Sequence, residues 1–160
     1  MAQNKEWGPL FWGVLHTAAE QLGKPRAPIN QIDEVNTWIL LLKSVEVAMP
    51  CQMCREHYHG WLASHPAAAF SPLRGIPLRE TARKWLYDLH EDVNKRREVV
   101  SGISMEQLPL LYGSLEGFQK KVEALVGALK LGVQYGRVTM EGTYSFRKHL
   151  HYFRKITDSI

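Results

Sequence analysis

The stretch WILLLKSVEVAMPCQMCREHY, residues 38–58, combines an apolar run, a proline and both cysteines of the chain. The run from Trp38 to Val47 repeats apolar side chains at helical spacing. Pro50 ends that helix and can open the next one, because proline is tolerated in the first turn of a helix but not in its interior. The stretch therefore predicts two consecutive helices, with Cys51 and Cys54 in the first turn of the second.

This cysteine pair must carry any sulfur chemistry of the chain, which has no other cysteine. In a first helical turn the unpaired N–H groups and the helix dipole favour thiolate and lower the pKa of a cysteine. The two residues between Cys51 and Cys54 let their sulfurs close a small disulfide ring, and such rings are typically reversible. A redox pair is the leading interpretation.

Two other interpretations of the pair stay open. Cys51, Cys54, His57 and His59 would form a zinc site, although zinc ligands usually come as two pairs separated by a longer loop. A pair of buried, unreactive cysteines is the other alternative, which the polar neighbours disfavour. A c-type haem is excluded because Arg55 stands where the ligand histidine is needed. A thioredoxin-like site is excluded because no strand pattern flanks the motif.

Helical periodicity extends along nearly the whole chain, and no strand pair with a hairpin turn is recognisable, which predicts an all-α protein. Residues 104–107 form a capping box that opens a helix with a continuous apolar stripe from Leu111 to Leu129. The last helix carries an aromatic stripe, which we expect to dock on the body of the protein. The predicted helices run from Gly8–Pro9 to near Leu22, from Asn30 to near Val45 and from the cysteine pair to near His65. Three more run from about Pro77 to near Val99, from Ser104 to near Leu129 and from about Thr143 to near Thr157.

Length, composition and charge exclude several classes of protein. The chain has 160 residues, enough for one domain, or one domain with an appendage, and for a core of useful size. No segment approaches the roughly 20 apolar residues of a membrane helix, and the first residues contain no hydrophobic signal region. We therefore expect a cytoplasmic protein that is not bound to a membrane. The net charge of +4 is modest and spread out, so a nucleic-acid partner is not indicated.

A second set of aromatic and polar side chains comes from other predicted helices. Trp12 and His16 are four residues apart, as are His90 and Asn94, so each pair shares one helical face. Taken singly, each has an ordinary explanation as a core residue. Together with Tyr87 they offer stacking surfaces and polar groups to a flat aromatic cofactor. Basic residues that would suit the phosphates of such a cofactor follow directly: Lys95, Arg96 and Arg97.

These strings together resemble the Erv/ALR family of FAD-dependent sulfhydryl oxidases, in the single Cys-x-x-Cys form that occurs in large DNA viruses. The resemblance implies a four-helix bundle with a fifth short helix that holds FAD, commonly as a homodimer. Residues 1–112 would be the oxidase domain, and 113–160 a helical extension packed on it. The strings that carry the resemblance, in the order and spacing of the family, are WGPLFWGVLH at 7–16, PCQMCREHY at 50–58, HEDVN at 90–94 and SMEQ at 104–107.

The resemblance also implies roles for single residues. Cys51 would exchange disulfides with the substrate, and Cys54 would lie beside the flavin. The implied activity forms disulfide bonds in protein dithiols and passes the electrons to O2, giving H2O2. The implied partner is a protein dithiol or a small thioredoxin-like protein. The residues implied to contact FAD are Trp12, His16, His57, Tyr87, His90, Val93 and Asn94, with Arg96 or Arg97 near the phosphates.

Some features depart from the family pattern. Glu91 replaces the usual asparagine after His90, and Pro9 stands where many members have an arginine. A second Cys-x-x-Cys, which serves some relatives as a shuttle, is absent from the sequence. The small number of cysteines fits a cytoplasmic location, which would be the host cytoplasm if the chain is viral. The alternative function is a non-catalytic helical module that binds zinc through Cys51 and Cys54.

Overall fold

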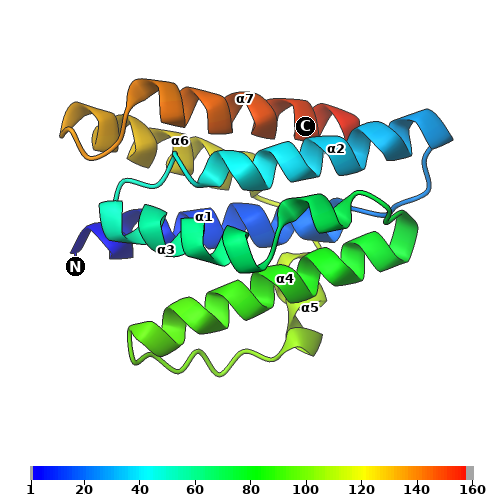
Figure 1. Cartoon of the computed structure of the whole chain (residues 1–160), viewed down its shortest axis with the longest axis horizontal. Helices are drawn as coiled ribbons and strands as arrows, with labels where there is room; N and C mark the ends of the chain where they lie inside the picture. The colour runs from blue at the N-terminus through cyan, green and yellow to red at the C-terminus, as the bar shows by residue number, and fades with distance from the viewer. Residues whose placement is uncertain (1, 158–160) are drawn as a thin grey trace.

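The computed structural model describes residues 2–157, with side chains from residue 7 onward, and these residues form helices joined by turns (Figure 1). The described part of the chain has no β-strand, which confirms the predicted all-α class. The longer helices are α1 (Ala2–Gln21), α2 (Pro28–Val45), α3 (Gln52–Ser64), α4 (Gly75–Arg96), α6 (Phe118–Gln134) and α7 (Met140–Ile156). The shorter ones are η1 (Ala67–Phe70), η2 (Met105–Gln107) and α5 (Leu108–Tyr112).

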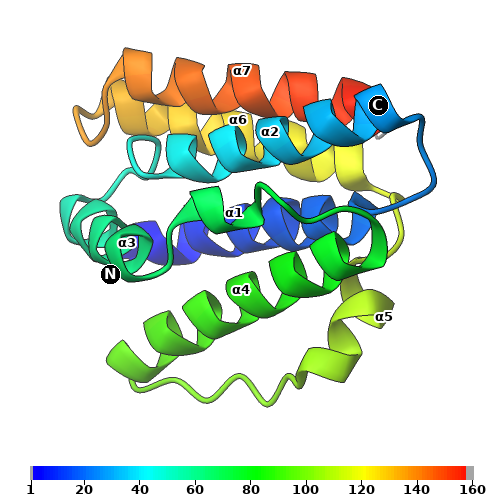
Figure 2. The ribbon, with the colours of Figure 1, turned by 45° about the vertical axis from the view of Figure 1, so that its right-hand side comes forward.

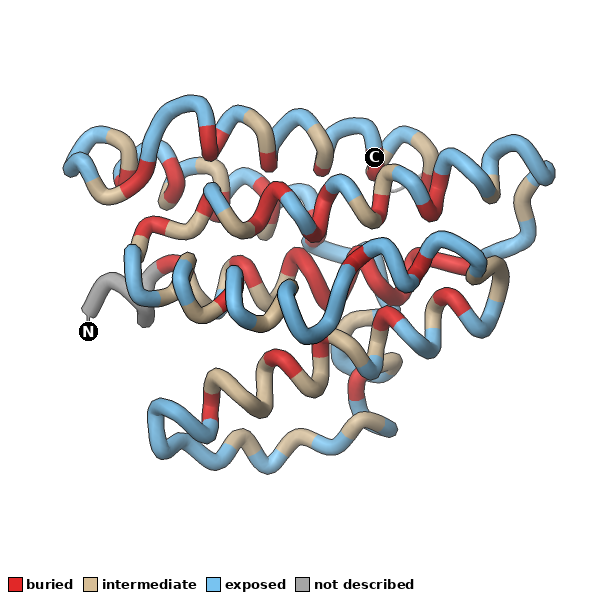
Figure 3. Tube along the Cα trace, viewed as in Figure 1, coloured by how far each residue is buried: buried red, intermediate tan, exposed pale blue. Residues whose placement is uncertain are grey.

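Helix α1 lies at the centre of the molecule and packs against α4, α5 and α6, while α2 packs along α7 (Figures 1 and 2). Buried residues lie on the inward sides of these helices, and exposed residues lie on their outer sides (Figure 3). Trp38 on α2 and Phe153 on α7 are fully buried, with ring centroids 5.8 Å apart. Phe146 on α7 contacts Phe11 on α1 at 5.1 Å. The aromatic stripe of the last helix therefore docks on the body, as its sequence predicts.

Four predicted helix starts differ from the structure: α4 begins at Gly75 and not at Pro77, α7 begins at Met140 and not at Thr143, and the starts of α1 and α2 are also wrong. Helix α1 begins at Ala2 and continues through Pro9, which lies inside it. Pro9 is exposed, so the helix loses one hydrogen bond there without burying an unpaired carbonyl under other elements. Helix α2 begins at Pro28 with Ala27 before it, so Asn30 is not its cap. Proline in the first turn, with its fixed φ, starts this helix instead.

The helix predicted from Ser104 through Leu129 is also wrong as one piece, because residues 113–117 interrupt it. The capping box of Ser104 and Gln107 is present. Gly117 has a φ of 73°, which glycine adopts easily and which a helix cannot continue through. The predicted stripe therefore divides: Leu111 and Leu115 are 51% and 36% exposed, whereas Leu125 and Leu129 of α6 are buried.

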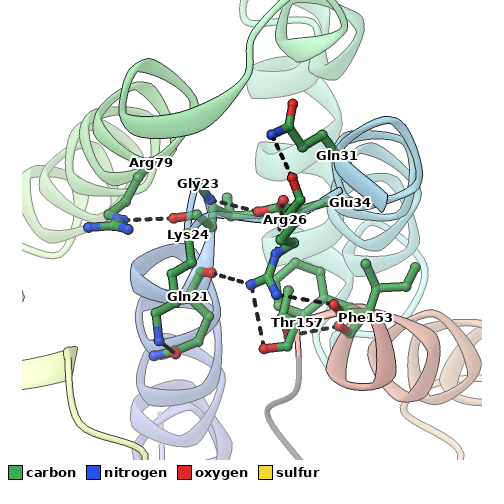
Figure 4. A network of polar contacts seen from close by, with 11 residues as sticks. Gln21, Gly23, Lys24, Arg26, Gln31, Glu34, Arg79, Phe153 and Thr157 are labelled. Atoms are coloured by element: carbon green, nitrogen blue, oxygen red, sulfur yellow. Dashed lines mark hydrogen bonds and ion pairs between the residues drawn. The ribbon is translucent and has the colours of Figure 1, made fainter. Parts of the chain in front are cut away.

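A buried polar network joins the end of α1 to α2 and to the end of α7 (Figure 4). Glu34 is 1% exposed, accepts a hydrogen bond from the Gly23 amide at 2.6 Å and pairs with Arg26 at 3.2 Å. Arg26 also donates to the carbonyls of Gln21 and Ile156. Glu34 and Arg26 thus compensate each other's charge inside the protein. Within the described residues, no helix has the length and apolar character needed to cross a bilayer.

Candidate functional site

The two cysteines form a disulfide at the start of α3, with their Cα atoms 5.2 Å apart. Cys51 is the N-cap residue, and its sulfur accepts a hydrogen bond from the Cys54 amide at 3.3 Å. The Cys51 amide in turn donates to the Met49 carbonyl at 2.8 Å, across Pro50. Both cysteines therefore lie at the start of the helix, as the sequence predicts, and the Cys51 sulfur lies where a free helical N–H group points.

The disulfide borders a cleft of about 500 Å³ between α1, α3 and α4, a volume typical of ligand pockets. We call it the disulfide cleft. Seven of the eleven residues predicted from the sequence line it: Trp12, Cys51, Cys54, His57, Val93, Arg96 and Arg97. Its other walls are mainly apolar and include Trp7, Phe11, Leu15 and Leu89. The buried Trp7 Nε1 has no hydrogen-bond partner among the described residues.

Behind the cleft, aromatic rings from three helices are stacked. Trp12 on α1 lies on His90 of α4, with ring centroids 4.0 Å apart and planes 10° from parallel. His16 lies 4.8 Å from Tyr112 of α5 in a similar stack. The two histidines are joined by a hydrogen bond of 3.3 Å between His16 Nε2 and His90 Nδ1. Trp12 thus belongs both to this ring cluster and to the cleft wall. His90 packs against Trp12, and His16 holds His90 by a hydrogen bond.

Burial determines the charge of these histidines. It lowers the pKa of His16 to about 3, with a further contribution from the neighbouring His90. It also lowers the pKa of His90 to about 4. Both rings are therefore neutral at pH 7, and one donates its ring N–H to the other. Burial raises the pKa of Tyr112, so its hydroxyl keeps its proton.

His57 forms one edge of the cleft through a contact between helices. Its Nε2 lies 2.6 Å from Asp92 Oδ2 on α4, and Arg96 reaches the same oxygen at 3.5 Å. His57, Asp92 and Arg96 also line a shallower groove on the outer side of α3 and α4, together with Trp61. The three side chains therefore separate the groove from the cleft.

The structure places Tyr87 and Asn94 away from the cleft lining. The Tyr87 hydroxyl donates to the Ile103 carbonyl at 3.3 Å, which ties α4 to the segment that leads to η2. Asn94 is buried near the end of α4, where its backbone carbonyl accepts hydrogen bonds from Arg97 and Val99. Glu91, the departure from the family pattern, accepts from the Ser101 hydroxyl at 3.0 Å. These residues support the segment after α4.

Sequence reasoning missed two residues of this arrangement. Asp92 lies inside the quoted HEDVN string, and its spacing of four from Arg96 was the available signal. Tyr112 has no local signal, because its partner His16 is 96 residues away in the chain. Within the described residues, no three His, Cys, Asp or Glu side chains are grouped so as to hold a metal ion. His57 is paired with Asp92 and His59 with Glu46.

Comparison with known proteins identifies a family. The model of the family described as "Erv1 / Alr family" matches residues 9–104, more than half of the chain. The matched region contains the disulfide and most of the ring cluster, and it ends just before η2. No curated protein and no solved structure matches the chain.

Proposed function

The chain belongs to the Erv1/Alr family, and on that premise we propose that it is an FAD-dependent sulfhydryl oxidase that forms disulfide bonds in protein dithiols. The observation that carries the proposal is the position of the Cys51–Cys54 disulfide on the border of the apolar disulfide cleft. A redox disulfide next to an aromatic-lined cleft has room to exchange electrons with a planar cofactor.

The cleft suits FAD in shape and in chemistry. Trp12 and the apolar side chains around it offer flat surfaces for a tricyclic ring, and Arg96 and Arg97 supply cations for phosphates. The unpartnered Trp7 Nε1 is a buried donor that a polar ring atom would satisfy. We therefore propose that Trp12, His57, Val93, Arg96 and Arg97 hold the cofactor directly. His16, His90, Tyr87 and Asn94 would hold these side chains and the segment after α4 in place.

The chemistry of the chain itself is thiol–disulfide exchange. A substrate thiolate attacks the Cys51 sulfur, the Cys51–Cys54 bond breaks, and Cys54 leaves as a thiolate. The second substrate thiol then attacks the mixed disulfide and releases Cys51, whose thiolate is stabilised by the Cys54 amide at 3.3 Å. The substrate loses two electrons and two protons, and its two sulfurs become joined. Bound FAD supplies the remaining step, the transfer of the two electrons to O2 to give H2O2.

Flavin binding and oxygen consumption test the proposal together. We expect the purified chain to show flavin absorbance, to melt at a higher temperature when FAD is added, and to produce H2O2 from O2 and dithiothreitol. Trp12→Ala should lose most of the flavin. His149→Ala should keep it, because His149 lies on α7 and bonds the Ser145 carbonyl. A colourless protein whose melting temperature is unchanged by FAD would contradict the proposal.

We also propose that the substrate is a protein dithiol or a small thioredoxin-like protein that reaches Cys51 directly. In Cys54→Ser, the free Cys51 thiolate attacks the disulfide of an oxidised partner protein, and one partner sulfur leaves as a thiolate. The mixed disulfide at Cys51 then accumulates, because the Cys54 thiol that would displace the partner is missing. Mass spectrometry of the trapped complexes should find partners with paired cysteines joined to Cys51. If the wild type oxidises dithiothreitol but Cys54→Ser traps no protein, the oxidase activity would stand and the proposal of a protein substrate would be contradicted.

A further inference from the structure

Helices α6 and α7, which lie outside the family match, form a hairpin that touches the segment in front of the disulfide. Gly132 of α6 faces the buried Pro50 so closely that an added Cβ would lie 2.9 Å from the proline Cβ. Gly142 of α7 leaves even less room, because an added Cβ there would overlap the Val47 carbonyl. Both glycines thus permit the hairpin to contact residues 47–50 directly.

An arginine makes a third connection. Arg55 Nη1 donates to the Met49 carbonyl at 2.5 Å and to the Arg137 carbonyl, in the turn between α6 and α7, at 2.9 Å. The turn is itself fixed, because Gly136 has a φ of 71° and the Arg137 amide donates back to the Gly132 carbonyl at 2.8 Å. This is the Schellman ending of a helix. The Arg137 carbonyl is therefore a rigid acceptor.

The same Met49 carbonyl accepts from the Cys51 amide at 2.8 Å. Arg55 thus joins the hairpin turn to a backbone group that helps to hold Cys51 in its N-cap position. A shift of Pro50 or Met49 would move the Cys51 sulfur relative to Cys54. The backbone of Met49 and Pro50 consequently links the hairpin contacts to the position of the Cys51 sulfur.

We propose that the α6–α7 hairpin positions the redox disulfide, with Arg55 as the positioning residue and Gly132 as the residue that contacts Pro50. The inference rests on the proposed function for its use: in the oxidase, the hairpin holds Cys51 where the bond to Cys54 reforms readily after each exchange. Loosening this contact lowers the effective concentration of one thiol at the other, and therefore disfavours the disulfide.

The test is the equilibrium of the cysteine pair with glutathione, measured on the full chain. Two glutathione thiols give one glutathione disulfide as the Cys51–Cys54 bond takes up two electrons and two protons. This equilibrium compares the oxidised and reduced forms of a folded protein. A loss of stability that is equal in both forms cancels from it, so a merely structural role would not change it.

Gly132→Ala and Gly127→Ala form the first matched pair, since both glycines lie in α6. An added Cβ meets Pro50 at position 132 and nothing within 4 Å at position 127. We expect Gly132→Ala to lower the equilibrium constant for forming the disulfide about tenfold, which equals about 30 mV for this two-electron couple. Gly127→Ala should stay within about twofold of the wild type, a difference of about 9 mV.

Arg55→Lys and Arg74→Lys form the second pair and keep the test decisive if Gly132→Ala fails to fold. Arg74 Nη1 also donates to two carbonyls, those of Ser71 and Leu73, but far along the chain from the disulfide. Lysine keeps the positive charge and loses the rigid guanidinium. We expect Arg55→Lys to shift the equilibrium in the same direction as Gly132→Ala, and Arg74→Lys to leave it unchanged.

Equal constants in all four variants would overturn the inference, as would equal shifts in the variants and their controls. The equilibrium is measured without O2 and read from the alkylation of Cys51 and Cys54, so oxidation through a bound flavin does not enter it. A chain that oxidises dithiols with FAD but shows no shift in Arg55→Lys would keep the proposed function and lose this inference. A shift of the equilibrium in Arg55→Lys, in a chain that never binds FAD, would support the positioning by the hairpin and contradict the proposed function.

Discussion

His57 Nε2 lies 2.6 Å from Asp92 Oδ2, a contact that joins the helix of the cysteines to the helix of His90. The two residues are 35 apart in sequence. The His57 ring lies on the border of the disulfide cleft, and Asp92 holds it from outside. The orientation of this cleft wall therefore depends on a single carboxylate.

Replacing that carboxylate should weaken cofactor binding. We expect Asp92→Asn to raise the dissociation constant of FAD roughly fivefold, which corresponds to about 1 kcal/mol for one hydrogen bond of this kind. Fluorescence titration of flavin measures it. Asp88→Asn is the matched control, because Asp88 lies on the same helix and pairs with the exposed Lys84. Equal affinity of the two variants would show that Asp92 does not position the wall.

The buried histidine pair predicts a loss of stability in acid. Unfolded histidines bind a proton below about pH 6.5, whereas burial lowers the pKa of His90 to about 4 and that of His16 to about 3. Between these limits the unfolded chain binds more protons, so the free energy of unfolding falls as the pH is lowered. The slope should approach about 1.4 kcal/mol per pH unit for each histidine.

Urea denaturation at pH 5.0 to 6.5 measures this slope. His16→Asn should flatten it, because the variant removes one of the protons that the unfolded chain takes up. His149→Asn, on the partly exposed face of α7, should leave it as in the wild type. An identical slope in both variants would mean that His16 does not resist protonation in the folded protein.

Much of this arrangement follows from local sequence. The proline before the cysteines, the capping box at Ser104 and the apolar spacing of the helices are short-range signals, and they predict where α3 and η2 begin. Pro50 also predicts that both cysteines lie at the start of α3, although the structure makes Cys51 its N-cap and not a residue of its first turn. Short-range patterns suffice here because each of these features depends on residues within one helical turn.

Contacts between distant segments could not be predicted in this way. His16 and His90 are 74 residues apart, and Tyr112 reaches His16 only because the helix predicted there breaks after it. An apolar stripe continues in register across Gly113 and Gly117, so periodicity alone favours one helix. The turn at 113–117 is decided by the packing of α5 and α6 against α1, which periodicity does not contain.

The polar network at the end of α1 predicts a large stability effect. Glu34→Ala would leave the Gly23 amide and Arg26 without their carboxylate inside the protein. We expect a loss of about 3 to 5 kcal/mol, seen as a fall of roughly 10 °C in melting temperature. Asp33→Ala, an exposed position on the same helix, should change stability by less than about 0.5 kcal/mol. Similar melting temperatures for both would show that the network contributes little.

The last prediction separates the roles of the two cysteines. In Cys51→Ser, Cys54 is left as a free thiol in the first turn of α3, where helical N–H groups favour its thiolate. With FAD bound we expect a long-wavelength absorbance band from a thiolate against the flavin ring, rising with pH as Cys54 loses its proton. Cys54→Ser should show no such band, because Cys51 lies on the substrate side in our assignment. Both variants should lose turnover of dithiothreitol by at least a hundredfold, about 2.7 kcal/mol in the barrier, since a single thiol cannot hold the electron pair as a disulfide. A band in Cys54→Ser alone would reverse the two roles while leaving the oxidase in place.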